Sequence, residues 1–207
     1  MAGSARGWAP WAWVAALVPS IAAAGFEPAA PRPGDDGWTV EAGEYRLDIG
    51  APDDPAHPRL WEADPLVVRH AGSCRVDGLG PLAAVHVDVP GGRVLVTSVS
   101  GSYTLLTTVR LADCAVLDRR SAFTAGVRVE GDEVVTAAAC ECGDDRTRCM
   151  CHAAQIVSVT PEGRLVDRPD DPRVARLTRE ALGIGFSGRA LVDNPYTPAA
   201  RIVAPLH

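Results

Sequence analysis

The chain has 207 residues, a formal net charge of −6 and 47% hydrophobic residues, which fits one globular domain with appendages. All 20 of its cationic residues are arginine, and none is lysine. The acidic balance argues against nucleic-acid binding, because phosphate recognition needs a surplus of cations on one face. The apolar fraction argues against intrinsic disorder, because burying it offsets the chain entropy lost on folding.

The first 24 residues predict a secretory signal peptide. Seventeen of them are hydrophobic, none is acidic, and Arg6 is the one charged residue. An apolar run over residues 11–18 precedes a Pro-Ser break and small residues at Ala22 and Ala24, the spacing that signal peptidase reads. We therefore expect cleavage after Ala24 and export to the periplasm or the extracellular space. No later segment has the length and hydrophobicity of a membrane span.

Residues 25–37 are rich in Pro, Gly and Ala, which predicts a flexible leader before a single β-rich domain over residues 38–207. A second Pro/Asp-rich stretch, residues 51–58, separates a short strand candidate at residues 38–49 from the rest of that domain.

From Leu60 onward, the pattern predicts antiparallel strands. In residues 83–89 the odd positions are apolar, so His86 and Asp88 are expected to point to the other, solvated side.

Two turn signals follow these residues. Gly91-Gly92 predicts a two-residue hairpin loop that places Val89 opposite Val94, and Ser100-Gly101 predicts a second one. Both registers put valines and leucines on one common face, as a meander requires.

The later chain predicts one repeat and one helix. Segments 87–94 and 127–134 share a Val-x-Val-x-Gly-x-x-Val pattern 40 residues apart, which is the length of a propeller blade. Asp170 and Asp171 are N-cap candidates before Pro172, and the periodic segment that follows predicts a helix over about residues 171–182. The predicted fold is therefore mostly β, an antiparallel meander or sandwich or partial propeller-like repeats, with one short C-terminal helix.

The cysteines are the most specific feature of the chain. Residues 140–152 read CECGDDRTRCMCH. A hairpin around a loop at 143–148 brings four cysteines onto one face in two opposed pairs, Cys140 with Cys151 and Cys142 with Cys149. Exported proteins meet an oxidising environment, so we expect both pairs to form structural disulfides. The even total of six cysteines also allows Cys74 to pair with Cys114.

A metal site is the alternative interpretation of the four hairpin cysteines, Cys140, Cys142, Cys149 and Cys151. Four thiolates suit tetrahedral Zn²⁺ or Cu(I). However, the C-x-C spacing differs from the usual C-x-x-C, and the register turns His152 away from the thiols. We therefore expect no cofactor, with Zn or Cu as the alternative, and a redox role for one C-x-C pair also stays open.

No catalytic motif stands in its required context. The string GIGFSG at residues 183–188 matches a dinucleotide-binding pattern, yet it follows a helix instead of preceding one. The charged side chains of the 143–148 loop are a candidate ligand surface, formed by Asp144, Asp145, Arg146 and Arg148.

These features predict an exported, disulfide-stabilised, β-rich binding or structural module of the cell envelope, with an envelope protein or a small ligand as its partner. Envelope metal binding through the four cysteines is the alternative function. A hydrolase with a site assembled from dispersed residues is the second alternative, and without a catalytic motif an enzyme is the less favoured class.

Overall fold

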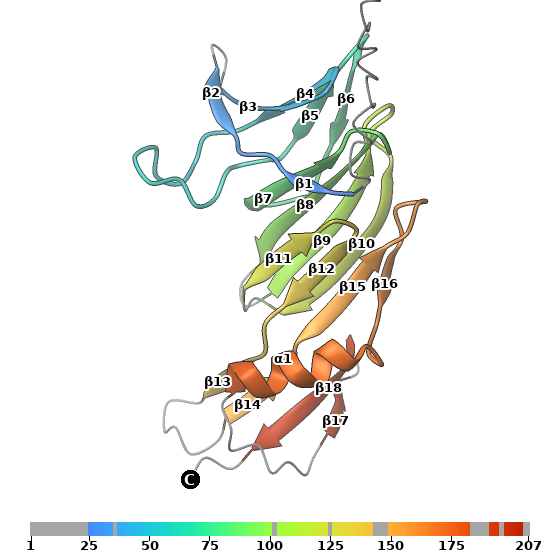
Figure 1. Ribbon diagram of the computed structural model, residues 1–207. Coiled ribbons are helices and arrows are strands. Elements are labelled where there is room, and N and C mark those ends of the chain that lie inside the picture. The colour runs from blue at the N-terminus through green and yellow to red at the C-terminus, as the bar shows by residue number, and fades with distance from the viewer. Residues whose placement is uncertain are drawn as a thin grey trace, which may run out of the picture.

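The computed structural model describes residues 25–34, 37–100, 103–123, 126–142, 149–182, 191–194 and 197–204. For residues 123, 139–142, 149–151, 181, 182, 191–194 and 197–204 it describes the backbone alone. Four antiparallel sheets and one helix make up these ranges, which confirms the predicted mostly β fold with a short C-terminal helix. The sheets follow one another as layers along an elongated molecule (Figure 1).

The four sheets are called the N-terminal, central, third and C-terminal sheets. The N-terminal sheet is formed by β2 (Arg32–Gly34), β3 (Gly37–Ala42), β4 (Tyr45–Ile49), β5 (Leu66–Arg69) and β6 (Ser73–Val76), in that order. The central sheet is formed by β1 (Glu27–Pro28), β7 (Leu82–Asp88), β8 (Arg93–Ser100), β9 (Tyr103–Arg110) and β10 (Val116–Phe123).

The other two sheets share one continuous stretch of chain. The third sheet is formed by β11 (Val127–Glu130), β12 (Glu133–Thr136), β15 (Gln155–Val159) and β16 (Leu165–Asp167). The C-terminal sheet is formed by β13 (Ala139–Cys142), β14 (Cys149–His152), β18 (Thr197–Ala204) and β17 (Leu191–Asn194). The hairpin of β13 and β14 thus leaves the third sheet between β12 and β15 and pairs elsewhere.

The predicted flexible leader is part of the fold. Phe26 is 2% exposed in the core, and its backbone N–H donates to the Gly131 carbonyl at 3.0 Å. Next to it β1 pairs with β7, and β2 pairs with β3. Composition predicted flexibility because prolines and glycines carry no periodicity. The segment is ordered because one large aromatic side chain and two short edge pairings are enough to hold it.

The central sheet is buried on both faces. In β8, Val94 and Val96 pack in the core shared with the N-terminal sheet, whereas Leu95 packs in the core shared with the third sheet. The six residues 93–98 are therefore all buried.

This double burial corrects the expectation that His86 and Asp88 face solvent. Asp88 is 3% exposed and His86 is half-buried, both on the side that the third sheet covers. The predicted alternation holds for Val85 and Val87, which are buried, whereas Val89 lies in the turn and is exposed. A strand pattern does not reveal whether its polar face meets water or another sheet.

The two predicted turns have the right faces but shifted registers. Val87, not Val89, lies opposite Val94, because the loop contains the four residues 89–92. Asp88 Oδ1 accepts the N–H of Gly91 at 2.9 Å, and this contact closes the larger loop. The next turn is centred one residue later than predicted, with Ser100 opposite Tyr103. Each shift is two positions in the pairing, so every side chain keeps its face.

The predicted repeat corresponds to equivalent positions in two sheets. Segment 87–94 lies in the first hairpin of the central sheet's meander, and segment 127–134 forms the first hairpin of the third sheet. Their loops differ, with four residues in the first and two in the second. The copies therefore share a place in the architecture rather than an identical turn.

Helix α1 spans Pro172–Leu182, close to the predicted 171–182. The carboxylate of Asp171 accepts the backbone N–H of Arg173 at 2.9 Å, so Asp171 is the N-cap of the two predicted candidates. Within the ranges described above, we find no helical segment with the length and hydropathy of a membrane span.

Candidate functional site

The four-cysteine hairpin has the predicted backbone register. Cys140 pairs with Cys151 and Cys142 with Cys149 across β13 and β14. Because the two pairs are two residues apart, they have the same hydrogen-bonding type, with Cα atoms about 4.5 or about 5.5 Å apart. Both values lie in the range that a disulfide spans, about 4.4–6.8 Å.

That register favours bridging over metal binding. Two rungs of a ladder are about 7 Å apart along a strand. Tetrahedral Zn²⁺ with Zn–S bonds of about 2.3 Å needs four sulfurs within about 3.8 Å of one another, so the strands would have to bend to reach one ion. The thiol groups themselves lie outside the described residues, as does the candidate ligand surface at 143–148. Among the described side chains, no three His, Cys, Asp or Glu groups gather as a metal-binding cluster.

The third cysteine pair forms a disulfide. Cys74 of β6 is bonded to Cys114, which lies between β9 and β10, with Cα atoms 5.7 Å apart. Cys114 is 8% exposed and belongs to the core between the N-terminal and central sheets. The bond therefore holds the last strand of one sheet against the next sheet.

A polar cluster joins the central and third sheets. The side chains of Asp88 and Arg93 form an ion pair in which they are 4% and 9% exposed. The Arg93 guanidinium also donates to the Thr160 carbonyl of the third-sheet side and lies 5.2 Å from the centre of the Phe26 ring. Since protein groups surround this pair, its role is to hold two sheets together and not to meet a ligand.

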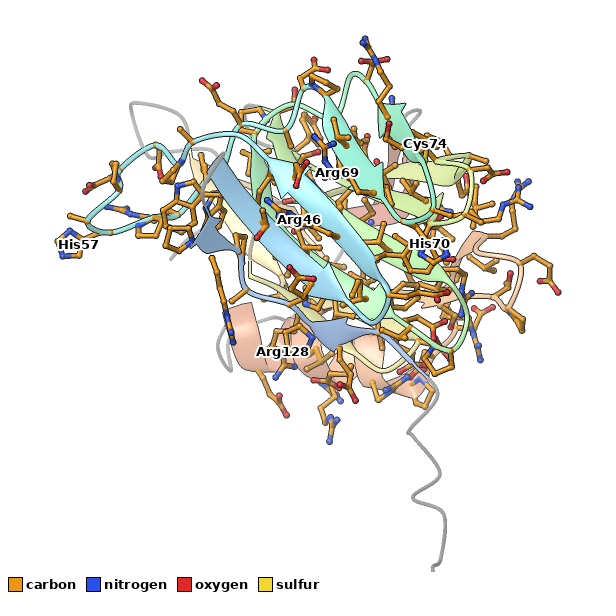
Figure 2. The ribbon with its side chains drawn as sticks, turned by 90° about the horizontal axis from the view of Figure 1, so that it is seen from above. Arg46, His57, Arg69, His70, Cys74 and Arg128 are labelled. Carbon is orange, nitrogen blue, oxygen red and sulfur yellow. A yellow bond between two sulfur atoms is a disulfide. The ribbon has the colours of Figure 1, made fainter. Side chains whose placement is uncertain are left out.

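The loop between β4 and β5 is the most distinctive surface feature. Residues 51–62 project from the N-terminal sheet, with His57 at the far tip (Figure 2). Backbone hydrogen bonds join its two limbs. The Gly50 N–H donates to the Glu62 carbonyl at 2.5 Å, and the Glu62 N–H donates to the Ala51 carbonyl at 3.0 Å. A Cβ at Gly50 would lie 2.7 Å from that Glu62 oxygen, so the close approach requires glycine.

The loop is also fixed at its tip and base. Asp53 Oδ1 accepts the backbone N–H groups of Arg59 and Leu60, each at 3.0 Å. These two N–H groups hold the pKa of the Asp53 carboxyl below its ordinary value, and that of Arg59 has the larger effect. At the base, Trp61 and Leu82 exchange two backbone hydrogen bonds of 2.9 and 2.8 Å. These hydrogen bonds thus hold the loop together at its base, along its limbs and near its tip.

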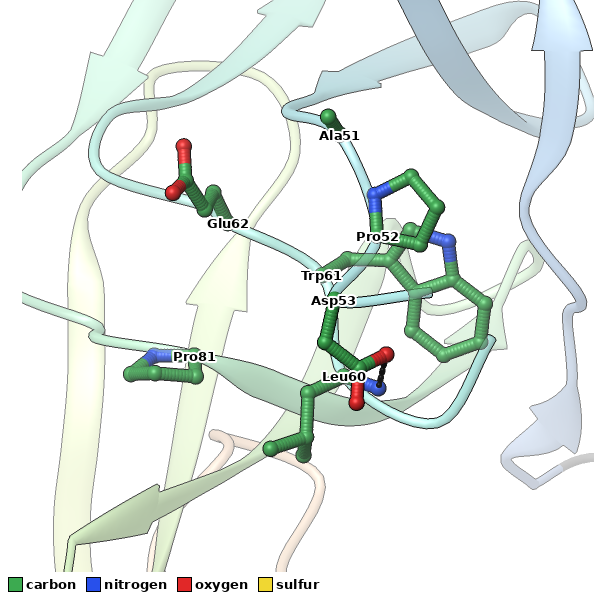
Figure 3. A pocket seen from close by; sticks show the side chains of 7 residues that line it. All are labelled: Ala51, Pro52, Asp53, Leu60, Trp61, Glu62 and Pro81. Atoms are coloured by element: carbon green, nitrogen blue, oxygen red, sulfur yellow. Dashed lines mark hydrogen bonds between the residues drawn. The ribbon is translucent and has the colours of Figure 1, made fainter. Parts of the chain in front are cut away.

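A pocket of about 230 Å³ opens between this loop and the start of β7 (Figure 3). It is lined by five residues that are mostly apolar, Ala51, Pro52, Leu60, Trp61 and Pro81, together with the acidic residues Asp53 and Glu62.

Trp61 connects the pocket to the core. Its ring packs against that of Trp38 with centroids 6.3 Å apart, in an edge-to-face arrangement. The indole Nε1 is buried and has no hydrogen-bond partner among the described residues. Trp38 and Trp61 are the two tryptophans that remain once residues 1–24 are removed. In a chain without residues 1–24, tryptophan fluorescence would therefore report on this pocket.

The composition of residues 51–58 predicts only a separator between strands and does not indicate the pocket. The usable signal was Asp53 near two prolines and a tryptophan, a composition typical of an ordered turn beside an aromatic wall. Pro81 comes from a segment 20 residues beyond Trp61, which no local pattern brings to the same place.

Comparison of the sequence with protein-family models and with curated proteins finds no match.

Proposed function

We propose that this protein is an exported, disulfide-stabilised binding module of the cell envelope that holds a small ligand in the pocket beside Trp61. The observation that carries the proposal is the pocket on a loop held together by hydrogen bonds at its base, along its limbs and near its tip. Ligand sites are mostly preformed, apolar and supplied with a few polar groups, which is the composition found here. A preformed loop also loses little entropy on binding, which raises affinity.

The lining favours a ligand with an apolar body and a cationic or hydrogen-bond-donating end. The aliphatic and indole surfaces of Leu60, Trp61 and Pro81 accept the body. The carboxylates of Asp53 and Glu62 accept hydrogen bonds and attract a positive charge. Because backbone N–H groups hold Asp53 in its ionised form, it is suited to accept a hydrogen bond and unsuited to deliver a proton.

Several features support export of the protein and its stabilisation by disulfide bonds. Cleavage after Ala24 would leave Phe26, the first core residue, in the mature chain. Cys74 and Cys114 form a disulfide, a bond that persists in oxidising compartments. The opposed pairs Cys140–Cys151 and Cys142–Cys149 support two further bridges, and the tighter one would contribute about 2.5 kcal/mol by closing about eight residues.

Three probes with one hydrocarbon body test the pocket: hexylammonium, hexanol and hexanoate. Each is titrated into the exported protein while the tryptophan emission is recorded. We expect saturable changes, with hexylammonium bound most tightly and hexanoate least. Glu62→Gln should reduce the preference for hexylammonium over hexanol by about fivefold, roughly 1 kcal/mol.

Glu41→Gln, which removes an exposed carboxylate of β3 outside the pocket, is the matched control and should leave that preference unchanged. Leu60→Asn should weaken all three probes together. Changes in emission that do not saturate, or that survive Leu60→Asn, would contradict the proposed site.

A further inference from the structure

The outer face of the N-terminal sheet is a second surface with its own chemistry. One face of this sheet packs in the core through residues such as Val40, Leu47 and Val68. The other face is open to solvent, since the side chains of Arg46, Arg69 and Arg75 are 40%, 60% and 66% exposed. Figure 2 looks onto the sheet from above, with Arg46 and Arg69 on neighbouring strands.

The strand register collects arginines on that outer face. Two cross-strand rows point outward, one with Arg32, Thr39, Asp48, Val67 and Arg75 and the next with Glu41, Arg46, Arg69 and Ser73. Four arginines thus stand against two acids, although the whole chain has a net charge of −6. Asp77, which follows β6, pairs with Arg75 at 2.7 Å, so the excess of positive charge centres on the other three arginines.

Arg46 and Arg69 form the centre of this face. They lie directly opposite each other on β4 and β5, a placement that is unfavourable for like charges. Asp48 lies between them. Its Oδ1 accepts from Arg46 Nε at 2.9 Å, and its Oδ2 accepts from Arg69 Nε. Two guanidinium groups therefore share one carboxylate, and a further anion placed over the pair would be attracted to both.

We propose that the outer face of the N-terminal sheet binds a carboxylated polysaccharide, whose carboxylates pair with Arg46 and Arg69. The guanidinium group suits this role because its planar fork matches a carboxylate in two parallel hydrogen bonds.

The neighbouring side chains distinguish a sugar from other polyanions. Ser73 offers an exposed hydroxyl group, and Asp48 and Glu41 accept hydrogen bonds from sugar hydroxyls. A lipid headgroup surface would instead press its phosphates against those two acids. The mixture of arginine, acid and hydroxyl groups therefore fits an acidic polysaccharide better than a membrane.

Hexagalacturonate, a short polymer with one carboxylate per sugar, is the probe. Its dissociation constant is measured by calorimetry on the whole exported protein, beside methyl-esterified hexagalacturonate and phosphatidylglycerol vesicles. We expect binding of the acid form alone, weakened about tenfold when salt is raised from about 20 to about 200 mM, because exposed charges are screened.

The double variant Arg46→Gln/Arg69→Gln should weaken binding by about tenfold or more. Arg128→Gln, a matched change of an exposed arginine on β11, should stay within about twofold. Arg46→Lys/Arg69→Lys keeps the charge and should recover part of the affinity, which separates loss of charge from loss of fold.

Three outcomes would overturn the proposal. The first is equal affinity for the acid and the ester, and the second is equal loss in Arg128→Gln and the double variant. The third is vesicle binding that exceeds binding of the uronate. The pocket beside Trp61 is not part of this surface, so failure here leaves the hexylammonium test unaffected.

Discussion

The two faces of the central sheet are held by different kinds of interaction. Toward the N-terminal sheet, the contact is a large aliphatic core with a disulfide, Cys74–Cys114, beside it. Toward the third sheet, a smaller apolar cluster is surrounded by charged and hydrogen-bonded groups, among them Asp88, Arg93 and Arg120.

The polar face fixes alignment in a way that the apolar face cannot. The Arg93 guanidinium reaches the Thr160 carbonyl, and Thr108 Oγ1 donates to the Gly163 carbonyl at 2.5 Å. Asp118 Oδ2 accepts the N–H of Leu165 at 2.9 Å. Each of these directional contacts forms at one register of the two sheets, whereas aliphatic side chains pack with many neighbours. We infer that the charged face specifies how the sheets stack and the apolar face supplies most of the burial.

The largest expected effect comes from removing the disulfide. Cys74→Ser/Cys114→Ser should lower the free energy of unfolding by about 4 kcal/mol, because the bond closes a loop of about 40 residues. The measurement is denaturant unfolding with the hairpin cysteines left intact. Hydrogen exchange should quicken in β5 and β6 before β15 and β16. Equal quickening in both pairs of strands would show that the two interfaces do not act separately.

A smaller loss is expected on the polar face. Asp88→Asn removes the partner charge of buried Arg93 and should cost about 3 kcal/mol. This loss of unfolding free energy is at the low end of the range for breaking a buried ion pair. The reason is that Arg93 still donates a hydrogen bond to the Thr160 carbonyl and lies 3.9 Å from Asp132. The control is Asp113→Asn, which alters an exposed pair with Arg110 and should cost less than about 1 kcal/mol. Similar losses of unfolding free energy in both variants would contradict the claim that burial determines how much an ion pair stabilises this protein.

His86 offers a pH test of the same face. Burial lowers the pKa of its imidazole from the ordinary 6.5. The folded state therefore binds the proton less readily than the unfolded state. The neutral His86 imidazole therefore makes its full contribution to the free energy of unfolding above pH 6.5. That contribution is lost as the pH falls from 6.5 toward the pKa of His86 in the folded state. His86→Leu should flatten the decline in unfolding free energy between about pH 7 and 5.5, whereas His57→Leu, at an 84% exposed site, should not.

The smallest effect concerns the rim of the third sheet. Arg173 donates to Asp171 and also pairs with Glu133 of β12, which ties the start of α1 to that strand. The Arg173 side chain lowers the pKa of the Asp171 carboxyl from 3.8 to about 2. The pair of Arg173 with ionised Asp171 therefore stabilises the folded state above pH 3.8, and this stabilisation is lost as the pH falls toward 2. NMR titration of Arg173→Gln should show a clear rise in this pKa, and an unchanged value would contradict the assignment.

Local patterns in the sequence predict the structural features that depend on neighbouring residues alone. The capped helix at Pro172–Leu182 and the register of the cysteine hairpin are local, and both are confirmed. The alternation predicted for β7 is confirmed at Val85 and Val87. The polar face of β7 is buried because the third sheet covers it. Residues 25–34 are ordered because β1 and β2 pair with the edges of other strands. The pattern of a single strand encodes neither contact. The Trp61 pocket was missed for the same reason, since Pro81 reaches it only through the pairing of Trp61 with Leu82.

The intact mass of the protein taken from its native compartment, after alkylation without reduction, tests the central claim most directly. An exported, disulfide-stabilised module predicts the mass of a chain that begins at Gly25, lowered by six hydrogens for three disulfides and carrying no alkyl group. Denaturation before alkylation makes every free thiol accessible, so buried cysteines are counted too. A chain that keeps residues 1–24, or four alkylated cysteines in a protein that purifies with Zn or Cu, would contradict the account.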